Sequence, residues 1–228
     1  SRARVNRLGD AMGIDEVIRI LEKEYPERQW RAHREPISEL ILTILSQNTS
    51  DVNSRRAFDR LMSAFPDWEL AANAPVEEIE AAIRSGGLAR IKAERIKLIL
   101  EEIVKRSGSL DLGFLHDLPL SDAKAWLRRL PGVGPKTAGC VLLFSLQMPA
   151  LPVDTHVFRV SKRLGLIDSS VSPDRAHQIL EGVVPPDKIY EFHLNMVEHG
   201  RRVCKAQRPR CGECIFNEGC PSSLAGGE

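Results

Sequence analysis

The stretch LPGVGPKTAG, from Leu130 to Gly139, decides the fold of this 228-residue chain. It lies between an amphipathic segment that ends at Leu130 and an apolar segment that begins near Pro135, and its glycines allow a tight backbone turn. A helix starting after this turn would present unpaired N–H groups and the positive end of its dipole. A phosphate fits at such a helix start. PGVG alone would equally suit an ordinary corner between helices, but the extended string LPGVGPKTAG predicts a helix–hairpin–helix.

Apolar residues elsewhere in the chain recur at the spacing of a helix. Three stripes follow the i, i+3, i+4, i+7 pattern: Phe58, Leu61, Met62 and Phe65; Ile96, Ile99, Leu100 and Ile103; and Ala123, Trp126, Leu127 and Leu130. Such stripes are typical of the buried faces of helices. We therefore predict an all-α protein with about ten short helices.

Residues that favour helix ends support this interpretation. Asp51 and Ser172 suit N-cap positions, and Pro173 suits the first position of a helix. Gly200 suits a helix stop.

The division into domains rests on helix patterns, because no repeat and no low-complexity linker is present. Residues 36–148 form a run of amphipathic segments that contains the hairpin stretch. Residues 1–35 and 149–228 remain for a second domain, in which an N-terminal helix would shelter the cysteine-rich C-terminus.

Overall charge does not indicate a partner, because the net charge is +1 and the sequence pI is about 7.7. A surface that binds nucleic acid would have to be local. No apolar run is long enough to cross a membrane, and residues 1–13 lack the apolar core of a secretory signal. We therefore expect a soluble, cytoplasmic protein without membrane contact, associated with the nucleoid if its source is bacterial or archaeal.

Four of the five cysteines crowd into the last part of the chain, with the spacing C-x6-C-x2-C-x5-C over Cys204, Cys211, Cys214 and Cys220. In an intracellular protein this crowding indicates a metal site rather than disulfides. Zinc is one alternative, although zinc ribbons normally use two separated C-x2-C pairs and this chain has one. The fifth cysteine, Cys140, is expected to be a buried thiol.

Several motifs together resemble the endonuclease III branch of the helix–hairpin–helix base-excision DNA glycosylases. They are LSQNTSD at Leu45–Asp51, GGLARIKAERI at Gly86–Ile96, LPGVGPKTAG, LPVDTHVFRV at Leu151–Val160 and HGRRVCKAQRPRCGEC at His199–Cys214. The resemblance covers residues 36–220, most of the chain. It implies a six-helix barrel domain for residues 36–148, a cluster domain made from both chain ends, and DNA crossing the cleft between them. It also implies that the four cysteines hold a [4Fe-4S] cluster.

Two residues are candidates for catalysis. Lys136 would stand at the start of the helix after the hairpin, where burial and the helix dipole both disfavour a charged ammonium. Asp154 suits an N-cap position. If its carboxylate lay close to Lys136, it would favour the charged ammonium and so oppose the effect of burial and the helix dipole. The sequence leaves open which effect dominates. The resemblance implies that Lys136 is the Schiff-base nucleophile and that Asp154 assists it, whereas His156 is expected to bond backbone or face phosphate.

Further residues are expected to contact DNA. The resemblance implies that Gln47 or Asn48 fills the space left by a flipped base and that Leu88 enters from the opposite side. Phosphate contacts are expected from the hairpin and from the basic loop, at Gly132, Val133, Gly134, Lys205 and Arg208.

These features predict a bifunctional DNA glycosylase and AP lyase that acts as a monomer on damaged duplex DNA. Its expected substrates are oxidised pyrimidines such as thymine glycol and abasic sites. Two rivals remain: a monofunctional glycosylase that removes thymine or uracil opposite guanine, and a noncatalytic iron–sulfur protein that binds DNA. The presence of both Lys136 and Asp154 argues against the noncatalytic rival.

Overall fold

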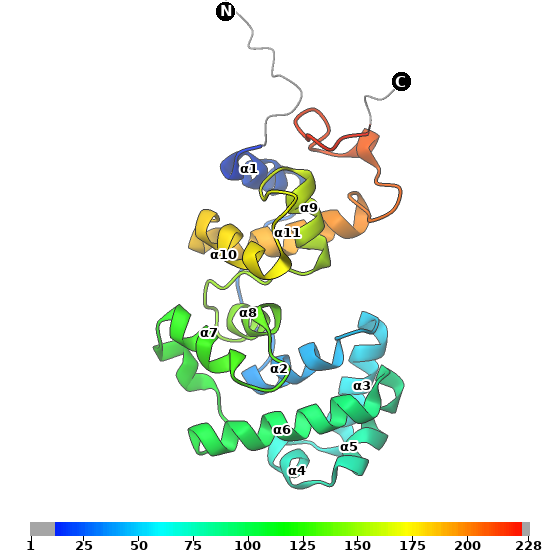
Figure 1. The fold of residues 1–228 in the computed structure, drawn as a ribbon, viewed down its shortest axis with the longest axis vertical. Helices are drawn as coiled ribbons and strands as arrows, with labels where there is room; N and C mark the ends of the chain where they lie inside the picture. Colours follow the sequence, from blue (N-terminus) through cyan, green and yellow to red (C-terminus); the bar gives the residue numbers. More distant parts are fainter. Residues whose placement is uncertain (1–11, 225–228) are drawn as a thin grey trace, which may run out of the picture. The chain divides into compact units, whose positions relative to one another are not determined.

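The computed structural model describes residues 12–224, and all regular secondary structure in that range is helical, as predicted (Figure 1). Residues 1–11, which carry most of the segment considered above for a secretory signal, lie outside the described residues. The chain divides into two compact units. One is Arg31–Ala150, and the other combines Ser1–Trp30 with Leu151–Glu228.

The unit Arg31–Ala150 contains seven α-helices among the described residues and two short 3₁₀ turns. Its elements are α2 (Pro36–Leu45), α3 (Asp51–Ala64), α4 (Trp68–Asn73), α5 (Val76–Ile83), η1 (Arg84–Gly86), α6 (Ala89–Ser107), η2 (Gly113–Asp117), α7 (Leu120–Arg128) and α8 (Pro135–Phe144).

Two helices of this unit, α2 and α8, are apolar on nearly all sides and pack against each other. Helices of this composition are stable only when the surrounding helices exclude water from every face. In α2, Ile37, Leu40 and Ile41 are fully buried. In α8, every residue from Thr137 to Phe144 is buried. The pair therefore forms the centre of the unit's core.

The three apolar stripes read from the sequence all contribute to this core, as predicted. The stripe on α6 is fully buried, whereas Phe58, Met62 and Trp126 at the edges of the other two are partly exposed. One expected helix end in this unit is displaced. Ser50, not Asp51, caps α3, because the Ser50 hydroxyl accepts a hydrogen bond from the Asn53 N–H. Cys140 is buried, as expected.

The second unit draws its helices from both ends of the chain. They are α1 (Ile14–Glu24), α9 (Thr155–Arg163), α10 (Pro173–Val183), η3 (Pro186–Lys188), α11 (Ile189–Arg202) and η4 (Cys211–Glu213). Ser172 caps α10 and Pro173 opens it, as predicted. The expected stop at Gly200 is wrong, because α11 continues to Arg202. A side chain at Gly200 would meet His156 of α9 at 2.9 Å, so this glycine allows α9 and α11 to pack closely.

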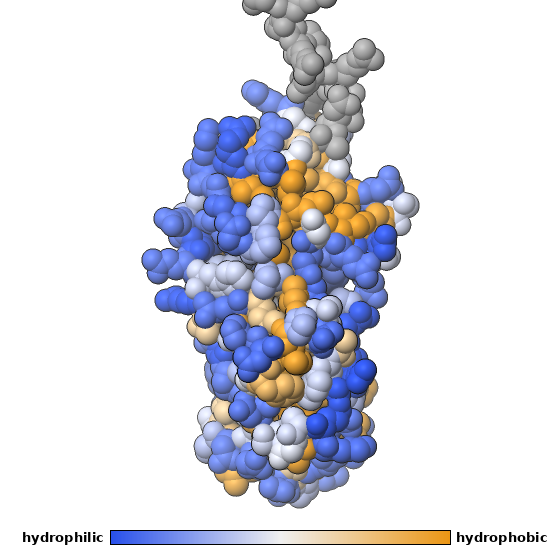
Figure 2. Space-filling view, turned by 90° about the vertical axis from the view of Figure 1, so that its left-hand side faces the viewer, coloured by the Kyte–Doolittle hydropathy of each residue, from blue (hydrophilic) through white to orange (hydrophobic). Residues whose placement is uncertain are grey.

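The protein surface carries mostly hydrophilic side chains on the face shown in Figure 2, with apolar residues gathered in patches. Among the described residues, no helix combines the length and the apolar composition needed to cross a bilayer. Leu88 and Leu98, both about half exposed, are two of the larger apolar side chains at the surface.

Truncating the core of the unit Arg31–Ala150 should be costly. We expect Leu40→Ala on α2 to lower the free energy of unfolding by about 2–5 kcal/mol, because Leu40 is fully buried and truncation leaves a cavity. Leu98→Ala, at a position that is 52% exposed, should cost less than about 0.5 kcal/mol. Urea denaturation of both variants makes the comparison. Equal losses would show that α2 is not at the centre of the core.

Candidate functional site

The hairpin between α7 and α8 has the backbone conformation that its glycines permit. Gly132 has a φ of +73°, and a side chain there would lie 2.5 Å from Cδ and Nε of Arg95. Val133 is buried, and its N–H donates to the Leu130 carbonyl at 3.2 Å. No side chain of the described residues caps the N-terminus of α8 after Gly134. The first N–H groups of α8 are therefore available to a phosphate.

A side chain from the end of α2 is bonded to this hairpin. Gln47 Nε2 donates to the Gly132 carbonyl at 3.3 Å, and Gln47 Oε1 accepts from Arg95 Nη1 at 3.1 Å. The next residue, Asn48, is exposed and has a φ of +53°. The structure thus brings the predicted Gln47 and Gly132 together and leaves the Asn48 side chain on the surface.

Leu88 also has an unusual backbone. It follows Gly87 at the start of α6, has a φ of +50° and is 52% exposed. A left-handed backbone is unfavourable for a leucine. Because the Leu88 side chain is half exposed, its burial within the protein does little to offset this strain. Such strained positions cluster at functional sites. Asn48 and Leu88 share this feature.

Lys136 is the second residue of α8 and is exposed. Its place at the helix start agrees with the sequence prediction. The burial expected there is wrong, because the Lys136 side chain is exposed, whereas α8 is buried from Thr137 onward.

Asp154 caps α9, because its Oδ1 accepts from the Val157 N–H at 2.8 Å. Three side chains fix the backbone just before it. The Leu151 N–H donates to Glu181 at 2.9 Å, the Val153 N–H donates to His177 Nε2 at 3.0 Å, and His193 Nδ1 bonds the Pro152 carbonyl at 2.9 Å. Nothing in the local sequence marks these three residues, since their partners are backbone groups 24 to 41 residues away. Lys136 and Asp154 belong to different units.

His156 has a structural environment. Its Nδ1 accepts from Arg159 Nη2 at 3.1 Å, and its ring packs against Gly200. Burial, the main cause, lowers the pKa of His156, and Asp154 opposes the effect. These contacts support a packing role over general-base catalysis.

The four C-terminal cysteines line one pocket together with Arg163 and His199. Around a single zinc ion, four thiolates would lie about 3.8 Å apart. Among residues 12–224, no three His, Cys, Asp or Glu side chains stand close enough to hold one metal ion. Four thiols that line one pocket are the ligand set that an iron–sulfur cluster requires. Burial raises the pKa of Cys214 to about 11, so binding as a thiolate requires cationic metal nearby.

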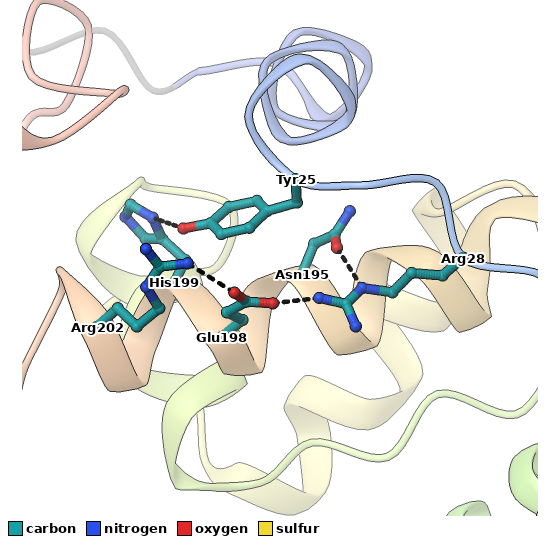
Figure 3. Close-up of polar contacts among 6 residues, drawn as sticks. All are labelled: Tyr25, Arg28, Asn195, Glu198, His199 and Arg202. Carbon is teal, nitrogen blue, oxygen red and sulfur yellow. Dashed lines mark hydrogen bonds and ion pairs between the residues drawn. The ribbon is translucent and has the colours of Figure 1, made fainter.

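His199, which lines this pocket, belongs to a group of polar contacts between α11 and the segment that follows α1 (Figure 3). His199 Nε2 lies 3.5 Å from Cys214 Sγ, and its Nδ1 is 2.9 Å from the Tyr25 hydroxyl. Burial lowers the pKa of His199 to about 4 and raises that of Tyr25 to about 12, so both side chains are neutral near pH 7. Arg28 bonds Asn195 and pairs with Glu198 on α11, which ties the segment after α1 to the helix that leads into the cysteines.

The basic loop that begins at Cys204 is exposed. Arg163 holds its backbone, with Nη1 donating to the Lys205 carbonyl at 2.7 Å. Lys205 and Arg208 are both exposed, and Arg208 has a φ of +50°. Their side chains are therefore accessible to an anionic partner.

Comparisons with known proteins agree with these features. Residues 41–186 match the HhH-GPD superfamily base excision DNA repair proteins, and residues 204–220 match the iron-sulfur binding domain of endonuclease III. Endonuclease III of Thermotoga maritima is 37% identical over 91% of this chain and 92% of its own length. A putative DNA glycosylase of Arabidopsis thaliana is 40% identical over 71% of this chain, which spans 55% of that relative.

A solved structure of a trapped endonuclease III–DNA covalent intermediate has a TM-score of 0.80 and 31% identity over 92% of this chain and 95% of that one. The fold and the cysteine site thus define a helix–hairpin–helix protein with an iron–sulfur domain. This chain belongs to the HhH-GPD superfamily of base excision DNA repair proteins. It is an enzyme of the endonuclease III type and carries a [4Fe-4S] cluster, and the match to the iron-sulfur binding domain covers residues 204–220.

The two hairpin glycines should differ in their tolerance of a side chain. Gly132→Ala should lower the free energy of unfolding by about 1–2 kcal/mol, because alanine is strained at positive φ and Arg95 must move. Gly134→Ala is the matched control, since its added Cβ meets nothing within 4 Å. Urea denaturation measures both. Equal stabilities would contradict the described hairpin backbone.

Removing one cluster ligand should affect metal content and DNA binding together. We expect purified protein to be brown with about four irons per chain. Cys211→Ser should lower iron content, soluble yield and DNA affinity, because the cluster orders the loop that carries Lys205 and Arg208. Iron analysis and a DNA-binding titration check this. A metal-free variant with normal folding and affinity would contradict the structural role, and one zinc with no iron would contradict the cluster.

Proposed function

We propose that this enzyme, a DNA glycosylase with AP lyase activity, removes oxidised pyrimidines such as thymine glycol from duplex DNA and then cleaves the strand. The observation that carries the proposal is an exposed lysine, Lys136, in the first turn of the helix that follows the hairpin. A lysine there can reach a nucleotide whose phosphates are bound by the hairpin N–H groups. The relation to endonuclease III, which has been trapped covalently on DNA, supports this assignment.

In the proposed reaction, the neutral amine of Lys136 attacks C1′ of the flipped nucleotide. The C1′–N bond breaks, and the base leaves with its electron pair and gains a proton. Loss of a proton from the amine and opening of the sugar give a Schiff base between Lys136 and C1′. The imine acidifies the C2′ proton, whose removal expels the 3′ phosphate by β-elimination. Hydrolysis of the imine then releases the lysine.

Asp154 is proposed to stabilise cationic character at C1′ while the base departs and to accept a proton from Lys136. Its N-cap bond uses Oδ1, which leaves Oδ2 for this role. The backbone before it is held by Glu181, His177 and His193, so the carboxylate is fixed in direction. Fixed electrostatic groups are effective because they need no reorganisation during the reaction.

The remaining contacts with DNA are proposed to hold the duplex and stabilise the flipped state. Phosphates bind the hairpin from Gly132 to Gly134 and the basic side chains Lys205 and Arg208. Asn48, not Gln47, is assigned to the space left by the base, because Gln47 is occupied by Arg95 and Gly132 whereas Asn48 is exposed. Leu88 enters from the other side. The bound cluster supplies order to the basic loop.

Trapping with borohydride tests the nucleophile. Wild-type protein should form a reduced adduct with a duplex that contains thymine glycol. Lys136→Ala should lose trapping and strand cleavage by at least about 1,000-fold while still binding the duplex, because the hairpin binds phosphate through backbone groups.

Asp154→Asn is the matched variant, since asparagine also caps helices and only the charge is lost. It should slow base release more than it slows cleavage at a preformed abasic site, where no base must depart. Unchanged trapping by Lys136→Ala would contradict the assignment of the nucleophile. Base release from a thymine or uracil mismatch without any adduct would favour the monofunctional alternative.

A further inference from the structure

A lysine outside the proposed catalytic pair is buried in the unit Arg31–Ala150. Lys92 lies on α6 and is 3% exposed. Its Nζ donates to the Leu45 carbonyl at 2.8 Å and to the Gly86 carbonyl at 3.3 Å. Burial lowers the pKa of Lys92. Burying an ammonium lowers the stability of a folded protein by several kcal/mol unless hydrogen bonds replace its contacts with water. A lysine at this buried position is therefore expected to have a specific role.

The two carbonyls belong to different segments of the chain. Leu45 is the last residue of α2, where carbonyls lack partners within the helix, and Gly86 closes η1. Asn48 follows Leu45 by three residues, and Leu88 follows Gly86 by two. Both have left-handed backbones and exposed side chains. Lys92 therefore connects two loops, the Asn48 loop and the Leu88 loop. The exposed side chains of Asn48 and Leu88 are the two residues proposed above to enter the duplex as wedges.

We propose that Lys92 is a positioning residue that fixes the Asn48 and Leu88 loops relative to each other, so that both wedges enter the duplex in one step. This inference rests on the proposed function of these residues. A methionine of similar size would fill the same space in the core, but it could not bond two carbonyls from separate segments. The two hydrogen bonds of the ammonium thus fix the relative position of two segments, which packing of an apolar side chain would not do.

The next polar residue on the same face of α6 extends this connection. Arg95, three positions after Lys92, bonds Gln47, which bonds the hairpin at Gly132. One helix face consequently holds both wedge loops and the phosphate-binding hairpin. A fixed relation among the three reduces the conformational freedom lost when the enzyme engages a flipped base.

The same helix offers a matched control. Lys97 Nζ also donates to two backbone carbonyls, those of Ala72 and Ala74, and its side chain is 19% exposed. These carbonyls end α4 and do not belong to a segment assigned to DNA binding. Lys97 also pairs with the exposed Glu101 at 3.9 Å. Each change, Lys92→Met or Lys97→Met, removes from α6 a lysine that bonds two carbonyls, but only Lys92→Met is expected to separate the Asn48 and Leu88 loops.

The test measures kcat/KM of each variant on thymine glycol in a fully paired duplex and in an unpaired bubble, where extrusion of the base is not required. Flipping is followed by the fluorescence of 2-aminopurine placed next to the lesion. Lys92→Met should lose about tenfold or more in flipping rate and in kcat/KM on the paired duplex, and less than about twofold on the bubble. Lys97→Met should lose less than about twofold on both.

A double-mutant cycle provides a second readout. Leu88→Ala should reduce processing of the paired duplex in wild type and have little further effect in Lys92→Met, because the wedge is already displaced. If Lys92→Met does not fold, Lys92→Gln is measured instead. Its shorter amide can donate but does not reproduce both bonds, so its flipping rate should fall below that of Lys97→Met. Melting temperatures of all variants show whether lost stability accounts for lost activity.

Equal losses on paired and bubble substrates, equal effects of Lys92→Met and Lys97→Met, or additive effects of Lys92→Met and Leu88→Ala would overturn the positioning role. Absence of a flipping signal from wild type on every lesion duplex would instead contradict the proposed function.

Discussion

The buried contact between α2 and α8 is the constraint on which the proposed DNA-binding residues of the unit Arg31–Ala150 depend. Both helices are apolar on nearly all sides, so their positions are fixed by exclusion of water rather than by a few polar bonds. The end of α2 leads into Gln47 and Asn48, and the start of α8 carries Lys136. Gln47 then bonds the hairpin that precedes α8. Packing of the two helices thus sets the relation between a wedge loop and the proposed nucleophile.

Hydrogen bonds from buried polar groups fix particular backbone segments within this apolar packing. They bond backbone carbonyls and N–H groups next to residues with proposed roles, as His193 does before Asp154 and as Lys92 does at the wedge loops. The bonds of Lys92 lie three residues before Asn48 and two before Leu88, which both have left-handed backbones. Strain at an exposed tip is stable only because its base is fixed by the surrounding structure.

The sequence predicted the helical fold, the hairpin and the cysteine site because each has a local pattern: periodic apolar residues, a glycine turn and closely spaced thiols. Lys92 could not be found in the same way, because a lysine in a helix is usually solvated and its carbonyl partners come from distant segments. The burial expected for Lys136 was wrong for a related reason. Exposure depends on how the hairpin meets the rest of the protein, which local sequence does not encode. The roles of the individual site residues remain predictions.

The central claim is that Lys136, and no other amine, forms the bond to the sugar. Peptide mapping by mass spectrometry after borohydride reduction on a thymine glycol duplex tests it most directly, since it identifies the modified residue without any substitution. The account predicts a deoxyribose-derived mass on the peptide that contains Lys136, at that residue alone. A sugar adduct on another lysine, or on the N-terminal amine, would contradict it.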